Sequence, residues 1–292
     1  MGATPRVGSS GAQAEALEER VGGCFTLPTA AVSDSPSTET FEMNADTSPP
    51  VALITGAARR IGAEIARTLH QAGFAVVVHY RHSDREAQAL CESLNHARPD
   101  SALSISANLG EARACSDLID AAVGWRGRLD ALINNASSFR RTPLGTVDEA
   151  AWAELIDGNL KAAFFCSQQA APALQRTHGA IVNICDVHTD RPLPDFSVYT
   201  AAKAGMVSLT RSLALELAPK VRVNAVSPGS LTWPEEDVFS EAERARLEAA
   251  IPLARIGNGQ DIGRTVLFLL RDAPYLTGQI IGVDGGASIV SH

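Results

Sequence analysis

The sequence has 292 residues, of which 45% are hydrophobic and 20% charged, the composition of an ordinary globular protein. Its 25 lysines and arginines stand against 33 aspartates and glutamates, so the formal net charge is −8. An acidic chain without a basic block lacks the electrostatic footprint of a nucleic-acid-binding protein. No apolar run reaches the ~18 residues that a membrane-spanning helix needs. We therefore expect neither a nucleic-acid partner nor a membrane span.

Cysteine and histidine usage bears on the compartment and on metal binding. The five cysteines are scattered and no two form a CxxC pair, which favours reduced thiols over a disulfide framework. The seven histidines include no HExxH motif and no cluster with cysteine at zinc-ligand spacing. The sequence therefore predicts a cytoplasmic protein without a bound metal.

Residues 1–49 differ in composition from the rest of the chain. Serine, threonine, alanine, glycine and proline dominate, and no continuous apolar segment of the secretory type is present. Such composition favours a disordered extension. Met43 stands just before the first apolar run, so translation beginning there is the alternative interpretation. We assign this extension no function and expect the folded domain at residues 50–292.

From Val51 onward, short apolar runs alternate with segments whose apolar residues follow a helical period. Most runs are continuously apolar, which is typical of parallel strands that helices cover on both faces. The sequence therefore predicts an α/β fold with a single Rossmann-type, doubly wound parallel sheet and helices on both faces. The expected strands lie at residues 51–55, 74–80, 102–107, 129–134, 180–184, 221–226 and 279–283.

A glycine-rich segment follows the first predicted strand and opens the first predicted helix. It reads Thr55-Gly-Ala-Ala-Arg-Arg-Ile-Gly62. Gly56 permits a tight turn, and Gly62 permits close packing of the helix on the strand. The helix N-terminus then presents N–H groups and a positive dipole to a pyrophosphate. Because a strand precedes it and a helix follows it, nucleotide binding is favoured over a purely structural turn.

The end of the second predicted strand bears on which dinucleotide is bound. A site for NAD usually has an acidic residue there, ~20 positions after the glycines, to hold the ribose 2′-hydroxyl. This chain has Arg81, His82 and Ser83 instead, and Arg60 lies in the glycine-rich segment. Two guanidinium groups and a hydroxyl suit a 2′-phosphate, so NADPH is the expected cofactor. A solvated loop with a nearby carboxylate, Asp84, is the alternative.

Tyr199 and Lys203 form a YxxxK pair on a predicted helix. Residues four apart lie on one helix face about one turn apart. An ammonium near a phenol favours the phenolate, so we expect Lys203 to lower the pKa of Tyr199 from about 10. Tyr199 would then act as an acid or base near neutral pH.

These motifs together resemble the short-chain dehydrogenase/reductase superfamily from about residue 51 to the end of the chain. The resemblance rests on the glycine-rich segment, Asn134-Asn-Ala136, the YxxxK pair, Pro228-Gly229 and Val283-Asp-Gly-Gly286. Two positions depart from the usual pattern. Arg60 replaces a glycine, and Asp186 stands where most members have a serine 13 residues before the tyrosine.

The two departures point to one branch of that superfamily. With Asn135-Ala-Ser-Ser-Phe139 and His79-Tyr-Arg-His-Ser83, they resemble the pteridine reductases and the bacterial dihydromonapterin reductases. The resemblance implies hydride transfer from NADPH to a C=N bond of a 7,8-dihydropterin, giving a tetrahydropterin. Whether dihydrofolate is also reduced stays open.

The resemblance also implies roles for individual residues. Tyr199 would be the catalytic acid, Lys203 would hold the nicotinamide ribose, and Asp186 would assist proton delivery or accept a hydrogen bond from the aminopterin edge. Phe139 would stack on the pterin ring opposite the nicotinamide. The implied catalytic residues are Asp186, Tyr199, Lys203 and Asn159, and the implied substrate-binding residues are Arg60, Ser137, Phe139, Asp186 and Tyr199. The implied cofactor-binding residues are Gly56, Arg60, Ile61, Gly62, Arg81, His82, Ser83, Asn108, Leu109, Asn135, Ala136, Ser137, Tyr199, Lys203, Pro228 and Gly229.

The stretch from Ser230 to Ala254 is expected to cover the substrate and to be helical in part. Glu235, Glu236 and Asp237 would repel polyglutamate-like anions, which favours an unconjugated pterin over folate. Trp233 is expected either to line the pocket or to pack beneath the loop.

Two other functions stay open at this point. One is a reductase of the same fold that acts on a ketone or a 3-oxoacyl group, for which a serine at position 186 would be expected. The other is a non-catalytic NADPH-binding regulator, although such a chain typically loses the tyrosine or the lysine. By resemblance to the superfamily, we expect a homotetramer.

Overall fold

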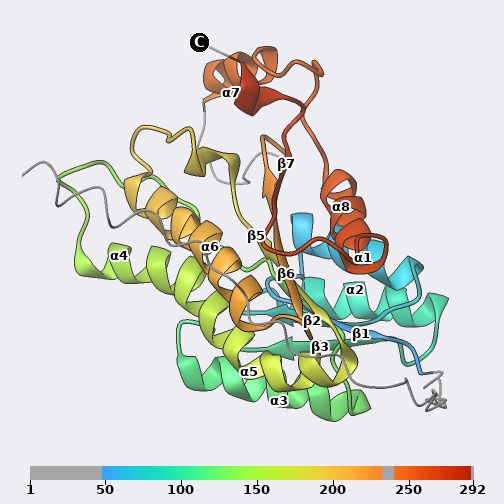
Figure 1. Ribbon diagram of the computed structural model, residues 1–292. Helices are drawn as coiled ribbons and strands as arrows, with labels where there is room; N and C mark the ends of the chain where they lie inside the picture. Colours follow the sequence, from blue (N-terminus) through green and yellow to red (C-terminus); the bar gives the residue numbers. More distant parts are fainter. Residues whose placement is uncertain (1–47, 232–239, 291–292) are drawn as a thin grey trace, which may run out of the picture. The chain divides into compact units, whose positions relative to one another are not determined.

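The computed structural model describes residues 48–231 and 240–290 (Figure 1). The predicted disordered extension falls almost wholly outside the described residues. Trp233, Glu235, Glu236 and Asp237 also lie outside them. The expectations placed on these residues therefore stay predictions.

All seven predicted strands are present, and each begins and ends within two residues of its predicted bounds. They form one parallel sheet in the order β3-β2-β1-β4-β5-β6-β7, so the doubly wound fold is confirmed. The strands are β1 (Val51–Ile54), β2 (Ala75–Tyr80), β3 (Ala102–Ser106), β4 (Ala131–Asn134), β5 (Ala180–Ile184), β6 (Arg222–Pro228) and β7 (Ile280–Val283).

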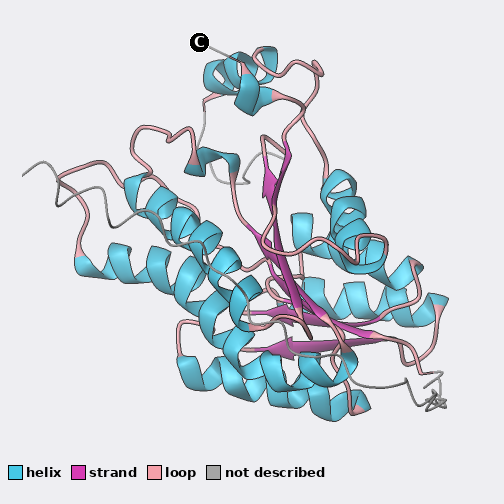
Figure 2. Cartoon of the chain, in the orientation of Figure 1, coloured by secondary structure: helices cyan, strands magenta, loops and turns pink. Residues whose placement is uncertain are grey.

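Helices cover both faces of this sheet (Figure 2). One face packs against α1 (Arg60–Gln71), α2 (Asp84–Ala97) and α8 (Gly259–Arg271). The other packs against α3 (Ala112–Arg126), α5 (Ala162–Thr177) and α6 (Ser197–Glu216). The remaining helical segments are α4 (Glu149–Ile156), α7 (Glu241–Ala249), the π-helix η1 (Asp157–Lys161) and the 3₁₀ turns η2 (Val187–Thr189) and η3 (Ala287–Ile289).

The continuously apolar strands follow from this layering. Successive side chains of a strand point to opposite faces of the sheet. In β1, Leu53 belongs to the core under α3, α5 and α6, whereas its neighbour Ile54 belongs to the core under α1, α2 and α8. Both side chains are fully buried, so neither face of the strand tolerates a polar residue.

The carboxyl ends of parallel strands lie along one edge of the sheet. The strand order turns back at β1, with β2 on one side of it and β4 on the other. In such sheets, ligands bind in the crevice beyond the carboxyl ends at this switch point. The segments that follow β1, β2, β3, β4, β5 and β6 carry the residues singled out from the sequence.

Three further features concern the described part of the chain. Cys91, Cys115, Cys166 and Cys185 are free thiols and buried. Over residues 48–231 and 240–290, no three histidine, cysteine or acidic side chains are grouped as metal ligands. Within the same ranges, no helix has the length and apolar character required to cross a membrane.

Candidate active site

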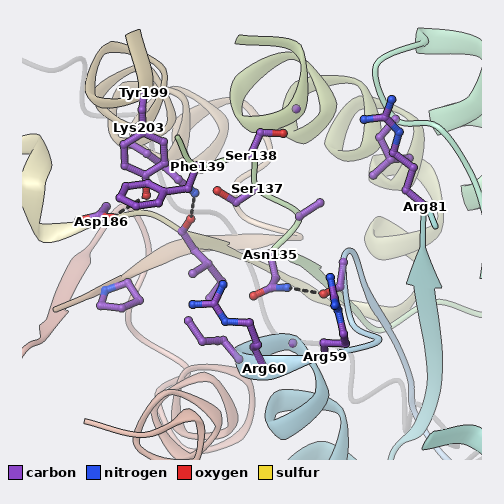
Figure 3. A pocket seen from close by; sticks show the side chains of 18 of the residues that line it. Arg59, Arg60, Arg81, Asn135, Ser137, Ser138, Phe139, Asp186, Tyr199 and Lys203 are labelled. Carbon is purple, nitrogen blue, oxygen red and sulfur yellow. Dashed lines mark hydrogen bonds between the residues drawn. The ribbon is translucent and has the colours of Figure 1, made fainter. Parts of the chain in front are cut away.

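A cavity of about 510 Å³ lies beyond the carboxyl ends of the strands (Figure 3). Every predicted cofactor- and substrate-binding residue lines it, and so do the predicted catalytic residues except Asn159. Arg81 lies at one end of the view, whereas Asp186, Tyr199, Lys203 and Phe139 gather at the other. The cavity therefore extends from the end of β2 to the start of α6, as an elongated ligand requires.

The glycine-rich turn is fitted closely against the segment after β4. A Cβ at Gly56, whose φ is +62°, would lie 2.8 Å from the Cα of Ala136, and a Cβ at Gly62 would lie 2.5 Å from the carbonyl oxygen of Gly56. The Asn135 amide donates to the carbonyls of Thr55 and Gly56 at 2.9 and 3.0 Å. Side chains at the two glycines would therefore disrupt the turn.

Arg60 adopts a backbone conformation that favours glycine. Its φ is +53°, in the left-handed region, which costs a residue with a Cβ about 1–2 kcal/mol. Figure 3 shows its side chain extending from the turn into the pocket. Strain of this kind persists where the surrounding structure supports it and a site uses it, so it favours a binding role for the guanidinium group.

His79, at the end of β2, holds the glycine-rich turn in place and was not singled out from the sequence. Its Nδ1 accepts a hydrogen bond from the backbone N–H of Gly56 at 3.0 Å, and its Nε2 lies 3.1 Å from the carbonyl oxygen of Ala107. An N–H can only donate and a carbonyl can only accept, so the imidazole is neutral with its proton on Nε2. Burial lowers the pKa of His79 to about 4.

We expect the contribution of His79 to stability to depend on pH. Between pH 6.5 and about 4, His79 is protonated in the unfolded chain but not in the native protein. The free energy of unfolding therefore decreases as the pH falls through this range. The shift corresponds to about 3 kcal/mol. In urea unfolding, the stability advantage of the wild type over His79→Asn should therefore shrink between pH 7 and pH 4. An advantage independent of pH would contradict the assignment.

Arg81, His82 and Ser83 lie together at the N-terminus of α2. Ser83 occupies the N-cap position, and its side chain makes no capping hydrogen bond to the helix. A helix N-terminus flanked by cationic side chains suits a phosphate. The nearby Asp84 carboxylate accepts hydrogen bonds from the Tyr80 hydroxyl of β2 at 2.5 Å and from the Gln88 amide of α2 at 3.0 Å, so it is already engaged by these two side chains.

Asp186 and Tyr199 are in direct contact. The Tyr199 hydroxyl donates to Oδ2 of Asp186 at 2.6 Å, and Oδ1 accepts from the backbone N–H of His188 at 2.8 Å. Asp186 follows β5 and caps η2, whereas Tyr199 lies in the first turn of α6. The carboxylate is therefore oriented by the backbone and faces the phenol.

The prediction that Lys203 lowers the pKa of Tyr199 is wrong in direction for this structure. Burial of the phenol and the neighbouring Asp186 carboxylate raise the pKa of Tyr199 well above its ordinary value. The Lys203 ammonium donates to the carbonyl of Ile184 at 2.8 Å and lies 5.9 Å from the centre of the Tyr199 ring. Burial in turn lowers the pKa of Lys203. Tyr199 therefore holds its proton at neutral pH.

Asn159 lies behind the cavity wall, in the π-helical segment η1. Its amide donates to the carbonyls of Ser138 and Leu155 at 2.9 and 2.8 Å, and its Oδ1 accepts from the Ser137 hydroxyl at 2.6 Å. Gly158 allows this approach, since a Cβ there would lie 2.8 Å from the Ser138 hydroxyl. π-Helical turns often occur at functional sites. Asn159 here positions Ser137, which does line the cavity.

Phe139 lines the cavity beside the phenol. Its ring meets the Tyr199 ring edge to face at 4.8 Å and stacks on Phe196 with 4.7 Å between ring centres. Phe196 was not singled out from the sequence; it is the N-cap residue of α6, three residues before Tyr199. His188 and Leu193 also line the cavity, and no sequence motif marks them. Leu247 lines it too; it lies in α7, within the stretch from Ser230 to Ala254 that was expected to cover the substrate and to be helical in part.

Comparisons with known proteins agree with this architecture. A family model described as enoyl-(acyl carrier protein) reductase matches residues 56–288. The 3-oxoacyl-[acyl-carrier-protein] reductase FabG of Staphylococcus aureus is 41% identical over 238 residues, covering 80% of this chain and 96% of the relative. Pteridine reductase 1 of Leishmania tarentolae is 38% identical over 286 residues, covering 83% of this chain and 98% of the relative. The chain belongs to the short-chain dehydrogenase/reductase superfamily of oxidoreductases, whose members use NAD(P)H and act on small molecules.

Proposed function

We propose that this protein is an NADPH-dependent pteridine reductase that reduces a C=N bond of a 7,8-dihydropterin. One observation carries the proposal: the Asp186 carboxylate faces the reaction centre, 2.6 Å from the Tyr199 hydroxyl. A carboxylate accepts hydrogen bonds and repels a carbonyl oxygen. It therefore suits a substrate that presents N–H groups, as the aminopterin edge does, better than one that presents only a carbonyl.

The residues of the glycine-rich turn and of α2 fit NADPH. Gly56 and Gly62 allow a tight turn that side chains would disrupt, and the N-terminus of α1 lies beside it. Arg60 and Arg81 supply guanidinium groups for phosphate, and Ser83 supplies a hydroxyl at the N-terminus of α2. The bound cofactor would supply the hydride. Residues of the protein would supply the proton and would position the substrate.

Tyr199 would deliver the proton. Its raised pKa keeps the phenol protonated at neutral pH, so a hydroxyl is available when negative charge develops on the ring nitrogen. Asp186 holds that hydroxyl in place and accepts hydrogen bonds from the substrate. Lys203, anchored on Ile184, would hold the nicotinamide ribose, and Phe139 would cover the other face of the pterin.

A 3-oxoacyl reductase is the second candidate. It is favoured by the 41% identity to the reductase FabG, which exceeds the 38% identity to pteridine reductase 1. Both candidate functions use the nucleotide turn and the Tyr199–Lys203 pair. They differ in what the substrate requires of residue 186, because a pterin presents N–H groups and a 3-oxoacyl group presents a carbonyl oxygen.

A substrate panel tests the proposal. NADPH oxidation is measured with dihydrobiopterin, dihydromonapterin, dihydrofolate and acetoacetyl thioester at matched concentrations. We expect turnover of the unconjugated dihydropterins to exceed that of the thioester by at least about 10²-fold in kcat/KM, with NADPH preferred over NADH. Preferred turnover of the thioester would instead establish the second candidate.

We also propose a homotetramer in the cytoplasm. Trp152 of α4, Phe164 of α5 and Phe268 of α8 are large apolar side chains between 40% and 52% exposed, and β7 forms one edge of the sheet. Exposed apolar side chains on helix faces suit contact with further copies of the chain. The mass measured by light scattering should be four times that of the chain.

A further inference from the structure

The contacts of Arg141 join three parts of the site that are far apart in the sequence. Its Nη2 atom lies 2.9 Å from Oε1 of Glu243 in α7, and its Nη1 atom lies 3.5 Å from Oδ2 of Asp195, just before α6. The Thr142 N–H donates to the Asp195 carbonyl at 2.6 Å. Arg141 therefore lies where the segment after β4, the segment after β5 and α7 meet.

Arg141 also contacts the aromatic side chains of the site. Its guanidinium carbon lies 5.4 Å from the centre of the Phe196 ring, within cation–π range. Phe196 is 1% exposed and stacks on Phe139, which in turn meets Tyr199. We call Phe196, Phe139 and Tyr199 the aromatic stack. Arg141 does not line the cavity, so its effect on a substrate would pass through this stack and through α7.

α7 is held at both ends by contacts among the described residues. It contains no buried residue. Beyond its C-terminus, Ile251 is buried and the Leu253 N–H donates to the Gly285 carbonyl at 3.1 Å. Near its N-terminus, Glu243 accepts from the N–H and hydroxyl of Ser240 through Oε2, which leaves Oε1 toward Arg141.

The ion pair matters because α7 contributes a residue to the cavity wall. Leu247 lies one turn after Glu243, on the same helix face, and lines the cavity. Arg141 and Glu243 are 35% and 47% exposed, and a pair this exposed adds little to the stability of the fold. What the Arg141–Glu243 pair does affect is the position of α7, and therefore the position of Leu247.

We propose that Arg141 is a positioning residue that holds α7 and the aromatic stack around the substrate; this inference rests on the proposed pteridine reductase function. Without Arg141, a smaller fraction of molecules has Leu247 and Phe139 in the arrangement that binds the pterin. The apparent Kd for the pterin equals the intrinsic Kd divided by the fraction of molecules in that arrangement, so the apparent affinity falls as the fraction falls. Substrate affinity therefore depends on Arg141, whereas the reaction of the bound substrate does not.

The test uses Arg141→Met, with Arg140→Met as the matched control. Arg140 is the adjacent residue and pairs with Glu154 of α4 at 3.1 Å, with 44% and 45% exposure. With saturating NADPH, Arg141→Met should raise the KM for dihydrobiopterin by about five- to ten-fold, with kcat and the Kd for NADPH within about two-fold of wild type. Arg140→Met should change none of the three.

Two further readouts separate positioning from a general loss of structure. Glu243→Gln retains an oxygen for Ser240 but lacks the charge, and it should raise the KM in wild type and not in Arg141→Met. Raising NaCl from about 20 mM to about 500 mM should raise the KM of wild type and of Arg140→Met but not of Arg141→Met, because salt screens an exposed ion pair and the dihydropterin is uncharged. Amide hydrogen exchange of residues 240–250 should be faster in Arg141→Met than in Arg140→Met.

The outcomes distinguish this inference from the proposed function. If wild type reduces acetoacetyl thioester and no dihydropterin, the proposed function fails, and the same comparison of KM values is made with the thioester. If wild type reduces its substrate and Arg141→Met keeps the KM of Arg140→Met, the inference fails. Equal exchange of residues 240–250 in the two variants would also overturn it.

Discussion

Tyr199→Phe should lower kcat/KM for dihydrobiopterin by about 10²–10⁴-fold, the usual contribution of a positioned proton donor. The variant loses only the hydroxyl that donates to Asp186 at 2.6 Å. Its ring still meets Phe139, so the fold and the Kd for NADPH should change little. Stopped-flow measurement of hydride transfer, with fluorescence titration of NADPH as the control, checks both.

The pH profile adds a second constraint on the same residue. Because the pKa of Tyr199 is raised well above its ordinary value, kcat/KM should show no decline from loss of the phenol proton below about pH 10. A decline near pH 7–8 that disappears in Tyr199→Phe would contradict the raised pKa. Retention of hydride transfer in Tyr199→Phe would exclude Tyr199 as the proton donor.

Asp186→Ser should reverse the preference between the two candidate substrates. A hydrogen bond to a charged group is worth about 1.5–3 kcal/mol, so loss of the carboxylate should lower kcat/KM for dihydrobiopterin about 10- to 100-fold. A serine hydroxyl can instead donate to a carbonyl oxygen, so turnover of acetoacetyl thioester should rise. The ratio of the two kcat/KM values is the measurement.

Asp186→Asn is the matched control for this prediction. It keeps the shape of the side chain and an oxygen for the His188 N–H but removes the charge. We expect it to lose dihydropterin turnover as Asp186→Ser does, without the gain on the thioester that the serine hydroxyl brings. If wild type and both variants reduce dihydrobiopterin equally, the carboxylate does not recognise the pterin.

The sequence alone was sufficient to predict the fold. Runs such as 75–78 are apolar at every position because helices cover both faces of the sheet, and this pattern is local. The nucleotide turn could be predicted for the same reason, since Gly56 has a φ of +62° and a Cβ at Gly62 would lie 2.5 Å from the carbonyl oxygen of Gly56 in the same turn. The YxxxK spacing likewise places Tyr199 and Lys203 on one turn of α6.

Only the tertiary structure decided the electrostatics and the outer contacts of the site. Spacing suggested that Lys203 lowers the pKa of the phenol. The fold instead buries the phenol and sets the Asp186 carboxylate on its hydroxyl, and both raise the pKa of Tyr199, while the Lys203 ammonium donates to the Ile184 carbonyl. Arg141 and Glu243 are 102 residues apart, and no local pattern predicts their contact. Helical and strand periods report neighbours along one element, whereas charge pairs and desolvation depend on elements that meet only in the folded chain.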